Sequence, residues 1–382
     1  MLDRLGRRHP AVIAIVLVTV AVTIATTGMT VAGFLARVWW VFDISTSFRP
    51  QAIGVLAVAV VVLLALRVWW VLPIALVSLA LNVAQVAPVY TRHQPAAAAG
   101  SPTLTIAHIN MQSNVADIPA MTRWLEGHPA DIVVVLDTKP DVANAFYAGV
   151  GDYHLVYPRV SRIVPRSGDP TPKKDKKTKK NGQTTDTTGV GGDTSTSTST
   201  STTTTTVTGD DGSGGYPLFD PRGAELVVLS ARDGVTAQIP DIRDLPESAI
   251  EIHTTLGDQA VSLLGLHTQS PTTSLNHDRR DRHLAGVTTW LQQASQPAIA
   301  FGDFNVTYYS PYFQQLLDRS GAHSSQLGFG IQASWPVQFR PAGIGIDQSV
   351  YTGGVTPISR QRGPSFGSEH RVLIVTYARA AG

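Results

Sequence analysis

The chain has 382 residues, and its formal net charge of +2 gives no strong attraction to nucleic acid. It contains no cysteine, which excludes disulfide bonds but does not fix the compartment. The length allows two or three domains, and because the N-terminal quarter is nearly all apolar, the soluble part is smaller than the whole.

Three apolar runs occupy this N-terminal quarter. No charged residue interrupts the first, from Ala11 to Ala36, and the others extend from about Ala52 to Leu66 and from about Val71 to Val89. The first run is long enough to span a bilayer. We therefore predict a membrane domain over residues 1–92 with three transmembrane helices. A cleaved signal peptide is the alternative for the first run, but that run lacks a clear small-residue cleavage site.

Basic residues before the first run indicate the orientation in the membrane. Arg4, Arg7 and Arg8 favour a cytoplasmic N-terminus. Three crossings then place the large C-terminal region outside the cytoplasm, so we expect a multi-pass protein of the cell membrane. We do not expect a transporter or channel, because the runs lack the charged residues that such proteins need within the membrane.

A linker over residues 93–102 precedes one domain over residues 103–382. Within this domain, residues 166–215 contain "KKDKKTKK" and a Thr/Ser repeat but almost no large apolar residues. Such a segment cannot bury enough surface to offset the entropy lost on ordering, so we predict a disordered insert. Its lysines are interpreted as a solvated charge run, with contact to anionic lipid headgroups as the alternative.

Strand-like runs dominate the rest of this domain, with helical patterns between several of them, notably Ile118 to Gly127 and Asn276 to Ser295. The pattern predicts an α+β domain of layered sheets covered by helices. The runs are "LTIAHIN", "DIVVVLDT", "HLVYPRV", "AELVVLSA", "AIEIHTTL", "AVSLLGLHT", "PAIAFGDFN", "IDQSVYT" and "VLIVTYA".

Polar residues recur where these runs stop. The run "PAIAFGDFN" ends in Asp303, Phe304 and Asn305. Alternation in an extended chain would send the carboxylate and the amide to one side and the ring to the other, which is a way to hold a metal-bound phosphate. A simple turn is the alternative. The other polar ends are Asn110, Asp137, His267, and the pair Glu369 and His370.

The order and spacing of these motifs resemble the endonuclease/exonuclease/phosphatase superfamily, which has the DNase I-like fold. "GDFN" matches outright, "HIN", "IVVVLDT" and "IDQ" are similar to the family's Asn, "LQE" and "IDH" motifs, and "GSEH" is similar to "SDH". The resemblance covers about residues 103–380 and implies a four-layer α/β/β/α sandwich. Three helices followed by an external domain resemble the membrane-anchored bacterial branch that includes proteins related to vancomycin and teicoplanin resistance.

The resemblance implies a divalent cation held by Asn110, Asp137 and Glu369. Hard oxygen ligands suit Mg²⁺, or else Mn²⁺ or Ca²⁺. Asp137 stands where the family has Glu, and Glu369 stands where it has Asp. The shorter and the longer side chain either compensate across one site or mark weakened metal binding.

The resemblance also implies the catalytic roles. His370 would be the base that activates water, and Asp347 would fix its tautomer. Asp303 and Asn305 would orient the nucleophile and a phosphate oxygen, and His267 would bind the scissile phosphate or assist the leaving group. In the Arg-rich segment "NHDRRDRH" we expect His277 and His283 on a solvated helix face, with Arg279 or Arg280 long enough to reach a phosphate.

The leading hypothesis is a membrane-anchored, extracytoplasmic, metal-dependent phosphoesterase that hydrolyses a phosphate ester or pyrophosphate of a lipid or envelope precursor. One alternative is a catalytically silent binding or scaffold protein on the same fold. Another is an extracellular nuclease, for which Tyr308, Tyr309 and Tyr312 are the only aromatic cluster near "GDFN".

Overall fold

The structure is a computed structural model that describes residues 9–112, 117–127, 130–138, 145–146, 150–158, 160–165, 215–219 and 226–381. The insert predicted over residues 166–215 lies outside this part of the chain except for Gly215. The two strands that flank it, β4 (Val160–Pro165) and β5 (Gly215–Phe219), pair with each other in antiparallel orientation. This pairing brings the two ends of the insert together.

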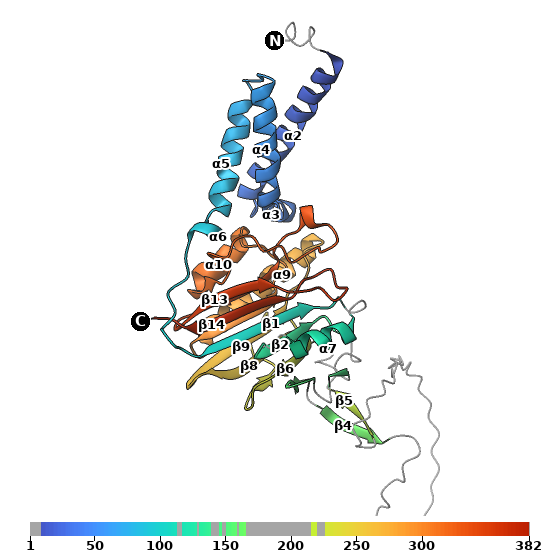
Figure 1. The fold of residues 1–382 in the computed structure, drawn as a ribbon, viewed down its shortest axis with the longest axis vertical. Coiled ribbons are helices and arrows are strands. Elements are labelled where there is room, and N and C mark those ends of the chain that lie inside the picture. The colour runs from blue at the N-terminus through green and yellow to red at the C-terminus, as the bar shows by residue number, and fades with distance from the viewer. Residues whose placement is uncertain are drawn as a thin grey trace, which may run out of the picture.

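The three apolar runs all fold into helices that stand together at one end of the molecule (Figure 1). The first, α2 (Pro10–Phe34), is the one helix in the described part that is long and apolar enough to cross a membrane. The second, α4 (Arg49–Ala65), passes that test only when joined to α3 (Trp40–Thr46), from which it is bent by 67°. The third is α5 (Leu72–Val86), and the short α6 (Pro88–Thr91) follows it.

The prediction of three full-length spans is therefore corrected to one in the described part of the chain, or two if the bent pair of α3 and α4 forms one span. The helices α4 and α5 have 17 and 15 residues, whereas a span needs about 20. Local backbone chemistry shortens both. After α4 ends, Arg67 takes a positive φ of 55°, which is not helical. Proline has no backbone N–H to donate to the preceding turn of a helix, and Pro88 stands two residues after the last residue of α5 and begins α6.

Two six-stranded sheets lie face to face in the C-terminal domain. In spatial order the first consists of β13 (Val355–Arg362), β14 (Leu373–Arg379), β1 (Thr103–Asn110), β2 (Ile132–Leu136), β6 (Leu226–Ser230) and β3 (His154–Tyr157). The second consists of β11 (His323–Ser324), β12 (Asp347–Tyr351), β10 (Ala298–Asp303), β9 (Gln259–His267), β8 (Ala249–Leu256) and β7 (Thr236–Gln238). Each sheet has one parallel pair, β1 with β2 and β9 with β10.

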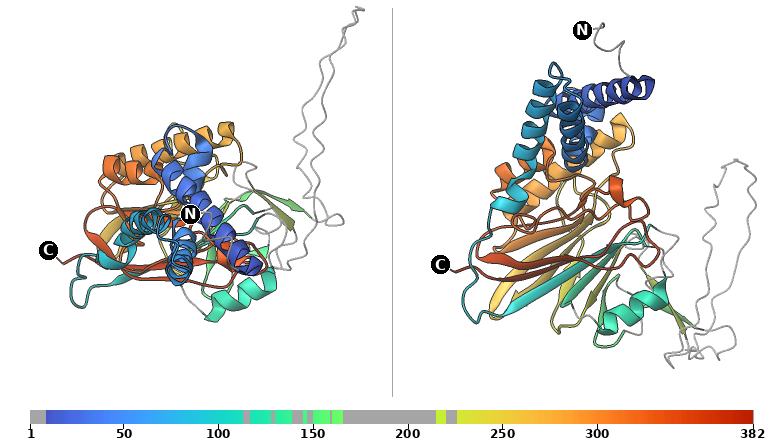
Figure 2. Two further views of the ribbon diagram at one scale, coloured as in Figure 1. Left: turned by 90° about the horizontal axis from the view of Figure 1, so that it is seen from above. Right: turned by 45° about the horizontal axis from the view of Figure 1, so that its top comes forward.

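Helices cover the outer face of each sheet (Figure 2). Side chains of α7 (Ile118–Gly127) pack on β1, β2 and β6 in one core cluster. Side chains of α9 (Ser274–Gln293) and α10 (Pro311–Ser320) pack on β9 and β10 in another. A short 3₁₀ helix, Arg340–Ala342, precedes β12. The arrangement is mixed α/β with two sheets, as the four-layer prediction expected, and is consistent with a DNase I-like fold.

The alternation of side chains decides which residues face the space between the sheets. In β1, Leu104 and Ile106 belong to the core cluster between the sheets, whereas Ala107 and Ile109 pack on the α7 side. Since successive strand residues point to opposite faces, His108 and Asn110 continue the inner row. The same parity, set by Ile299 and Phe301 in β10, places Asp303 on the inner face of the second sheet.

Candidate active site

Strand pairing brings three of the predicted site residues together around the end of β10. Asp303 is its last residue and lies in register with Asp347 of β12 on one side and His267 of β9 on the other. The preceding residue, Gly302, has a φ of 143°, and a Cβ there would overlap the carbonyl oxygen of Leu266. Only glycine therefore allows this strand to end so close to its neighbour.

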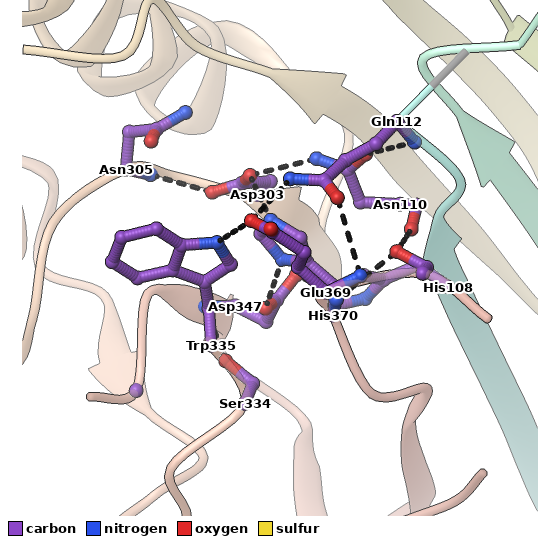
Figure 3. A network of polar contacts seen from close by, with 12 residues as sticks. His108, Asn110, Gln112, Asp303, Asn305, Ser334, Trp335, Asp347, Glu369 and His370 are labelled. Atoms are coloured by element: carbon purple, nitrogen blue, oxygen red, sulfur yellow. Dashed lines mark hydrogen bonds and ion pairs between the residues drawn. The ribbon is translucent and has the colours of Figure 1, made fainter. Parts of the chain in front are cut away.

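Asp347 lies between two buried histidines (Figure 3). Its Oδ2 is 3.0 Å from Nδ1 of His370, and its Oδ1 is 3.1 Å from Nε2 of His108. The first hydrogen bond turns Nε2 of His370 toward Asp303, at 3.8 Å from its Oδ2. The pairing of Asp347 with His370, predicted from the sequence, is present in the structure.

Asp303 is buried at the centre of the site (Figure 3). Its Oδ2 accepts a hydrogen bond of 2.9 Å from Nδ2 of Asn110 and lies 3.6 Å from Nε2 of His267. Its Oδ1 accepts one of 2.8 Å from the backbone N–H of Asn305. Four of the predicted site residues, Asn110, His267, Asn305 and His370, thus converge on this one carboxylate.

The pKa values of the two buried carboxylates of the site shift in opposite directions. Burial raises the pKa of Asp303 above its usual value, although His370 opposes the shift. Burial acts in the same direction on Asp347, but His370 and His108 outweigh it, so the pKa of Asp347 is lowered. Burial alone would lower the pKa of His370, whereas the carboxylates of Asp347 and Asp303 raise it to about 9.

The strand end at "GDFN" is both a turn and part of the site. Phe304 is fully buried among the residues under α9 and α10, as the alternation predicted. Asn305, however, has a φ of 48°, and its backbone N–H bonds back to Asp303, so the chain turns instead of staying extended. Its side-chain Nδ2 donates to the carbonyl of Thr268 at 2.9 Å. The turn keeps Asn305 next to Asp303.

Glu369 and Asn110 are connected through Gln112 (Figure 3). Oε2 of Glu369 accepts from Nε2 of Gln112 at 3.3 Å and from Nε1 of Trp335 at 3.2 Å. The backbone N–H of Gln112 donates to Oδ1 of Asn110 at 3.1 Å. Asp137 directly follows Leu136, the register partner of Asn110, and therefore lies at the neighbouring strand end.

The residues at these strand ends fit a hard divalent cation, because their donors are carboxylate and amide oxygens. Within the described part of the chain, the group whose ligand atoms lie within 4.8 Å of one another is Asp303, Asp347 and His370. In that group Nδ1 of His370 and Oδ2 of Asp347 are 3.0 Å apart, which is the length of a hydrogen bond. These two atoms are therefore bonded to each other in this structure. The metal set of Asn110, Asp137 and Glu369 stays a prediction.

Three further residues of the site, His108, Gln112 and Trp335, were not predicted from the sequence. The first two stand two residues on either side of Asn110 in "HINMQ", so the alternation applied to "GDFN" would have singled out His108 at the same inner face. Gln112 lies beyond the end of β1 at a positive φ of 46°. Trp335 comes from the loop before β12, and no local pattern marks it.

The expectations for the start of α9 are partly wrong. His277 is buried, with its Nε2 3.2 Å from Oδ2 of Asp43, and not on a solvated face. Arg280 is also buried, since its Nη2 donates to Asp43 at 2.7 Å and to Asp281 at 2.6 Å. Its Nη1 is 3.4 Å from the carbonyl of Asn305. Arg280 thus links α3 to the turn that contains Asn305. The contact of Arg279 or Arg280 with a phosphate stays a prediction.

Comparison with known families adds to this geometry. Residues 107–370 match the profile of the Endonuclease/Exonuclease/phosphatase family. The chain belongs to this family. Members of the family are typically hydrolases that act on phosphate esters, and they generally depend on divalent metals. The match begins in β1 and ends at His370, so it spans all of the strand ends that form the site.

Several solved structures resemble the chain at low sequence identity. The endonuclease/exonuclease/phosphatase from Bacteroides vulgatus is 12% identical with a TM-score of 0.45, covering 72% of this chain and 99% of its own. Humanized D. rerio TDP2 is 13% identical with a TM-score of 0.45, covering 72% and 98%. A mannosyl-6-phosphatase from Bacteroides thetaiotaomicron is 12% identical with a TM-score of 0.42, covering 72% and 99%. A comparison with curated proteins finds no match.

Proposed function

We propose that the protein is a membrane-anchored, extracytoplasmic phosphoesterase that depends on a divalent metal. Its substrate is a phosphate ester or pyrophosphate of a lipid or envelope precursor. The observation that carries this proposal is the buried Asp303 carboxylate, on which Asn110, Asn305, His267 and His370 converge. Such a cluster holds both a water molecule and a phosphate in fixed positions, which is what phosphoryl transfer to water requires.

In this proposal Asp303 accepts the proton of the attacking water. A base works best when its pKa approaches the working pH, and burial shifts the pKa of Asp303 in that direction. His370 was expected from the sequence to be the base, but Asp347 and Asp303 raise its pKa to about 9 against the effect of burial, so without a bound cation it carries a proton near neutral pH. It then donates from Nε2 and opposes the negative charge on the phosphoryl oxygens. Asp347 accepts a hydrogen bond from Nδ1 of this imidazolium and so orients the ring.

The remaining residues position the substrate and the cation. Asn110, Asp137 and Glu369 would hold the divalent ion, which supplies positive charge against the phosphate oxygens. Asn305 would orient a phosphoryl oxygen. His267 is 24% exposed at its side chain and so is the most accessible of the histidines near Asp303. It is suited to contact the leaving group.

Membrane placement rests on the outward surface of the N-terminal helices. Val18 of α2, Val58 and Val61 of α4 and Val77 of α5 are each more than half exposed, at 63%, 66%, 65% and 59%. Exposed apolar surface on several neighbouring helices is typical of contact with lipid. We infer that α2 crosses the membrane and that the apolar surfaces of α4 and α5, which are shorter than a span, lie against lipid beside it. A single crossing from a cytoplasmic N-terminus also places the C-terminal domain outside the cytoplasm. The substrate is then near the membrane surface.

The nuclease alternative is less well supported. Tyr308 and Tyr309 are buried in the core cluster with Phe313, so they do not form an open platform on which bases stack. The silent-scaffold alternative predicts the same fold without turnover, and only a measurement of activity separates it from the enzyme.

The proposal is tested with the full chain in lipid nanodiscs. Hydrolysis is measured on soluble phosphodiesters, on phospholipids and on polyprenyl pyrophosphate, each with Mg²⁺, Mn²⁺ or EDTA. We expect metal-dependent turnover that favours a lipid substrate and is absent in Asp303→Asn. Lack of turnover on every substrate would favour the scaffold. A reporter fused at Gly382 tests the topology, and its activity in a cytoplasmic form would contradict the extracytoplasmic placement.

A further inference from the structure

A cavity of about 550 Å³ lies at the junction between the membrane helices and the C-terminal domain. One wall is the end of α2 and the turn after it, from Gly33 to Val38. The opposite wall is α10, with Gln315 and Arg319 among its lining residues. Arg49, the first residue of α4, and Gln85 of α5 complete it. None of the active-site residues described above lines this cavity.

The lining of the cavity is positively charged. It contains Arg37, Arg49 and Arg319 against one acidic residue, Asp318. The ion pairs between arginine and a carboxylate in the described part of the chain involve other arginines, at 232, 280 and 379. In the described part of the chain none of these three guanidinium groups forms an ion pair, and one carboxylate, Asp318, stands against three positive charges in the lining. An excess of guanidinium groups around one space is an arrangement that recognises phosphate.

Arg49 is the most informative of the three. It is 3% exposed, and its Nε has no hydrogen-bond partner. Its Nη1 makes a long contact of 3.4 Å with Oδ1 of Asn82, and its guanidinium lies 4.8 Å from the ring centroid of Phe34. Burying a guanidinium without a counter-charge is costly. An anion in the cavity would supply both the charge and the missing acceptor.

The backbone next to Arg49 leaves space for its guanidinium. A Cβ at Gly33 would lie 3.0 Å from Nη2 of Arg49, so a larger residue at this turn of α2 would displace the group. Arg37, in contrast, is exposed, and its guanidinium already donates to Oε1 of Gln315 at 2.8 Å. The site therefore combines one fixed, buried cation with two exposed ones that can close on a ligand.

We propose that this cavity binds the phosphate of an anionic membrane phospholipid. The last turn of α2 and the start of α4 form it, so it lies at the depth where a membrane helix ends and lipid headgroups begin. Free phosphate has the same chemistry, and the experiment below separates the two sources. The proposal shares with the proposed function only the placement of the helices in the membrane. It does not depend on catalysis.

A bound headgroup would connect α2 and α4 to α10 and so stabilise the junction. The test measures the melting temperature of the full chain, delipidated in neutral detergent, after addition of phosphatidylglycerol, phosphatidylcholine or inorganic phosphate. We expect phosphatidylglycerol to raise it by about 5 °C or more, and phosphatidylcholine to have little effect. A rise of the same size with inorganic phosphate would assign the site to free phosphate instead.

The variant Arg49→Gln should abolish this rise. Arg67→Gln is the matched control, because it removes the same charge from an exposed arginine beyond the opposite end of α4 and should keep the rise. If Arg49→Gln does not fold, the pair Arg37→Gln and Arg319→Gln, both exposed, tests the same cavity. An equal rise in the cavity variants and in Arg67→Gln would overturn the proposal. Melting needs no turnover, so an inactive enzyme would not affect the result.

Discussion

Replacing Asp347 with asparagine isolates the electrostatic partner of His370. The change keeps the size of the side chain but removes the charge that lies 3.0 Å from Nδ1 of His370 and 3.1 Å from Nε2 of His108. In the wild-type protein this charge is the first contribution that raises the pKa of His370 to about 9. In Asp347→Asn only Asp303 and Glu369 oppose burial, so the pKa of His370 should fall toward or below its usual value.

The size and sign of the effect follow from linkage. A histidine with a pKa of about 9 in the folded protein and about 6.5 when unfolded stabilises the folded state by about 3 kcal/mol. Because the folded pKa is the higher one, this stabilisation is fully present below about pH 6.5 and is lost as the pH rises through about 9. The free energy of unfolding of the wild type should exceed that of Asp347→Asn at low pH. This difference should shrink by about 3 kcal/mol as the pH rises across that range.

The assay is urea unfolding of the full chain in detergent with EDTA, at intervals from about pH 6 to about pH 10. Chelation is needed because a bound cation would shift the pKa of His370. His370→Gln and the double variant complete a double-mutant cycle in which other titrating groups cancel. If the free energy of unfolding changes with pH in the same way in wild type and in Asp347→Asn, the electrostatic account of His370 is wrong.

Three further substitutions test other parts of the account. Asp303→Asn should lower turnover at least about a hundredfold, as for a lost proton acceptor, while circular dichroism and melting stay close to wild type. Gly302→Ala should prevent correct pairing of β10 with β9, because the Cβ of the alanine would overlap the carbonyl oxygen of Leu266. The yield of folded protein should therefore collapse. A normal yield would contradict the close approach of the two strands at Gly302. Asp43→Asn should destabilise the protein by about 3 kcal/mol, since it removes the buried carboxylate between Arg280 and His277 and leaves Asp281 to neutralise both. An unchanged melting temperature would contradict this.

The sequence predicted the residues at the centre of the candidate site better than those around them. The strand-end positions of Asp303, Asp347 and His370 follow from apolar runs that stop, and the structure brings these three together. His108 lies inside β1 and not at its end, so only strand parity, set by Leu104 and Ile106, marks it as inward-facing. Trp335 comes from a loop whose path depends on tertiary packing, which local pattern does not encode.

The errors at the N-terminal helices have a different physical cause. Hydropathy identified all three apolar segments, but helix length depends on where the backbone turns, and Arg67 and Pro88 end α4 and α5 early. His277 and Arg280 look like solvated residues in "NHDRRDRH" because a helical segment alone does not show what covers it. Their partner, Asp43, is more than two hundred positions away along the chain.

The most direct test of the central claim is phosphate release by the full chain with and without a divalent cation. Wild type in nanodiscs that contain a lipid pyrophosphate should release phosphate with Mg²⁺ or Mn²⁺, stop when EDTA is added and resume when excess cation is restored. Asp303→Asn, matched in fold and melting temperature, should release none under any of these conditions. Equal release by wild type and Asp303→Asn, or release that EDTA does not affect, would contradict a metal-dependent phosphoesterase centred on Asp303.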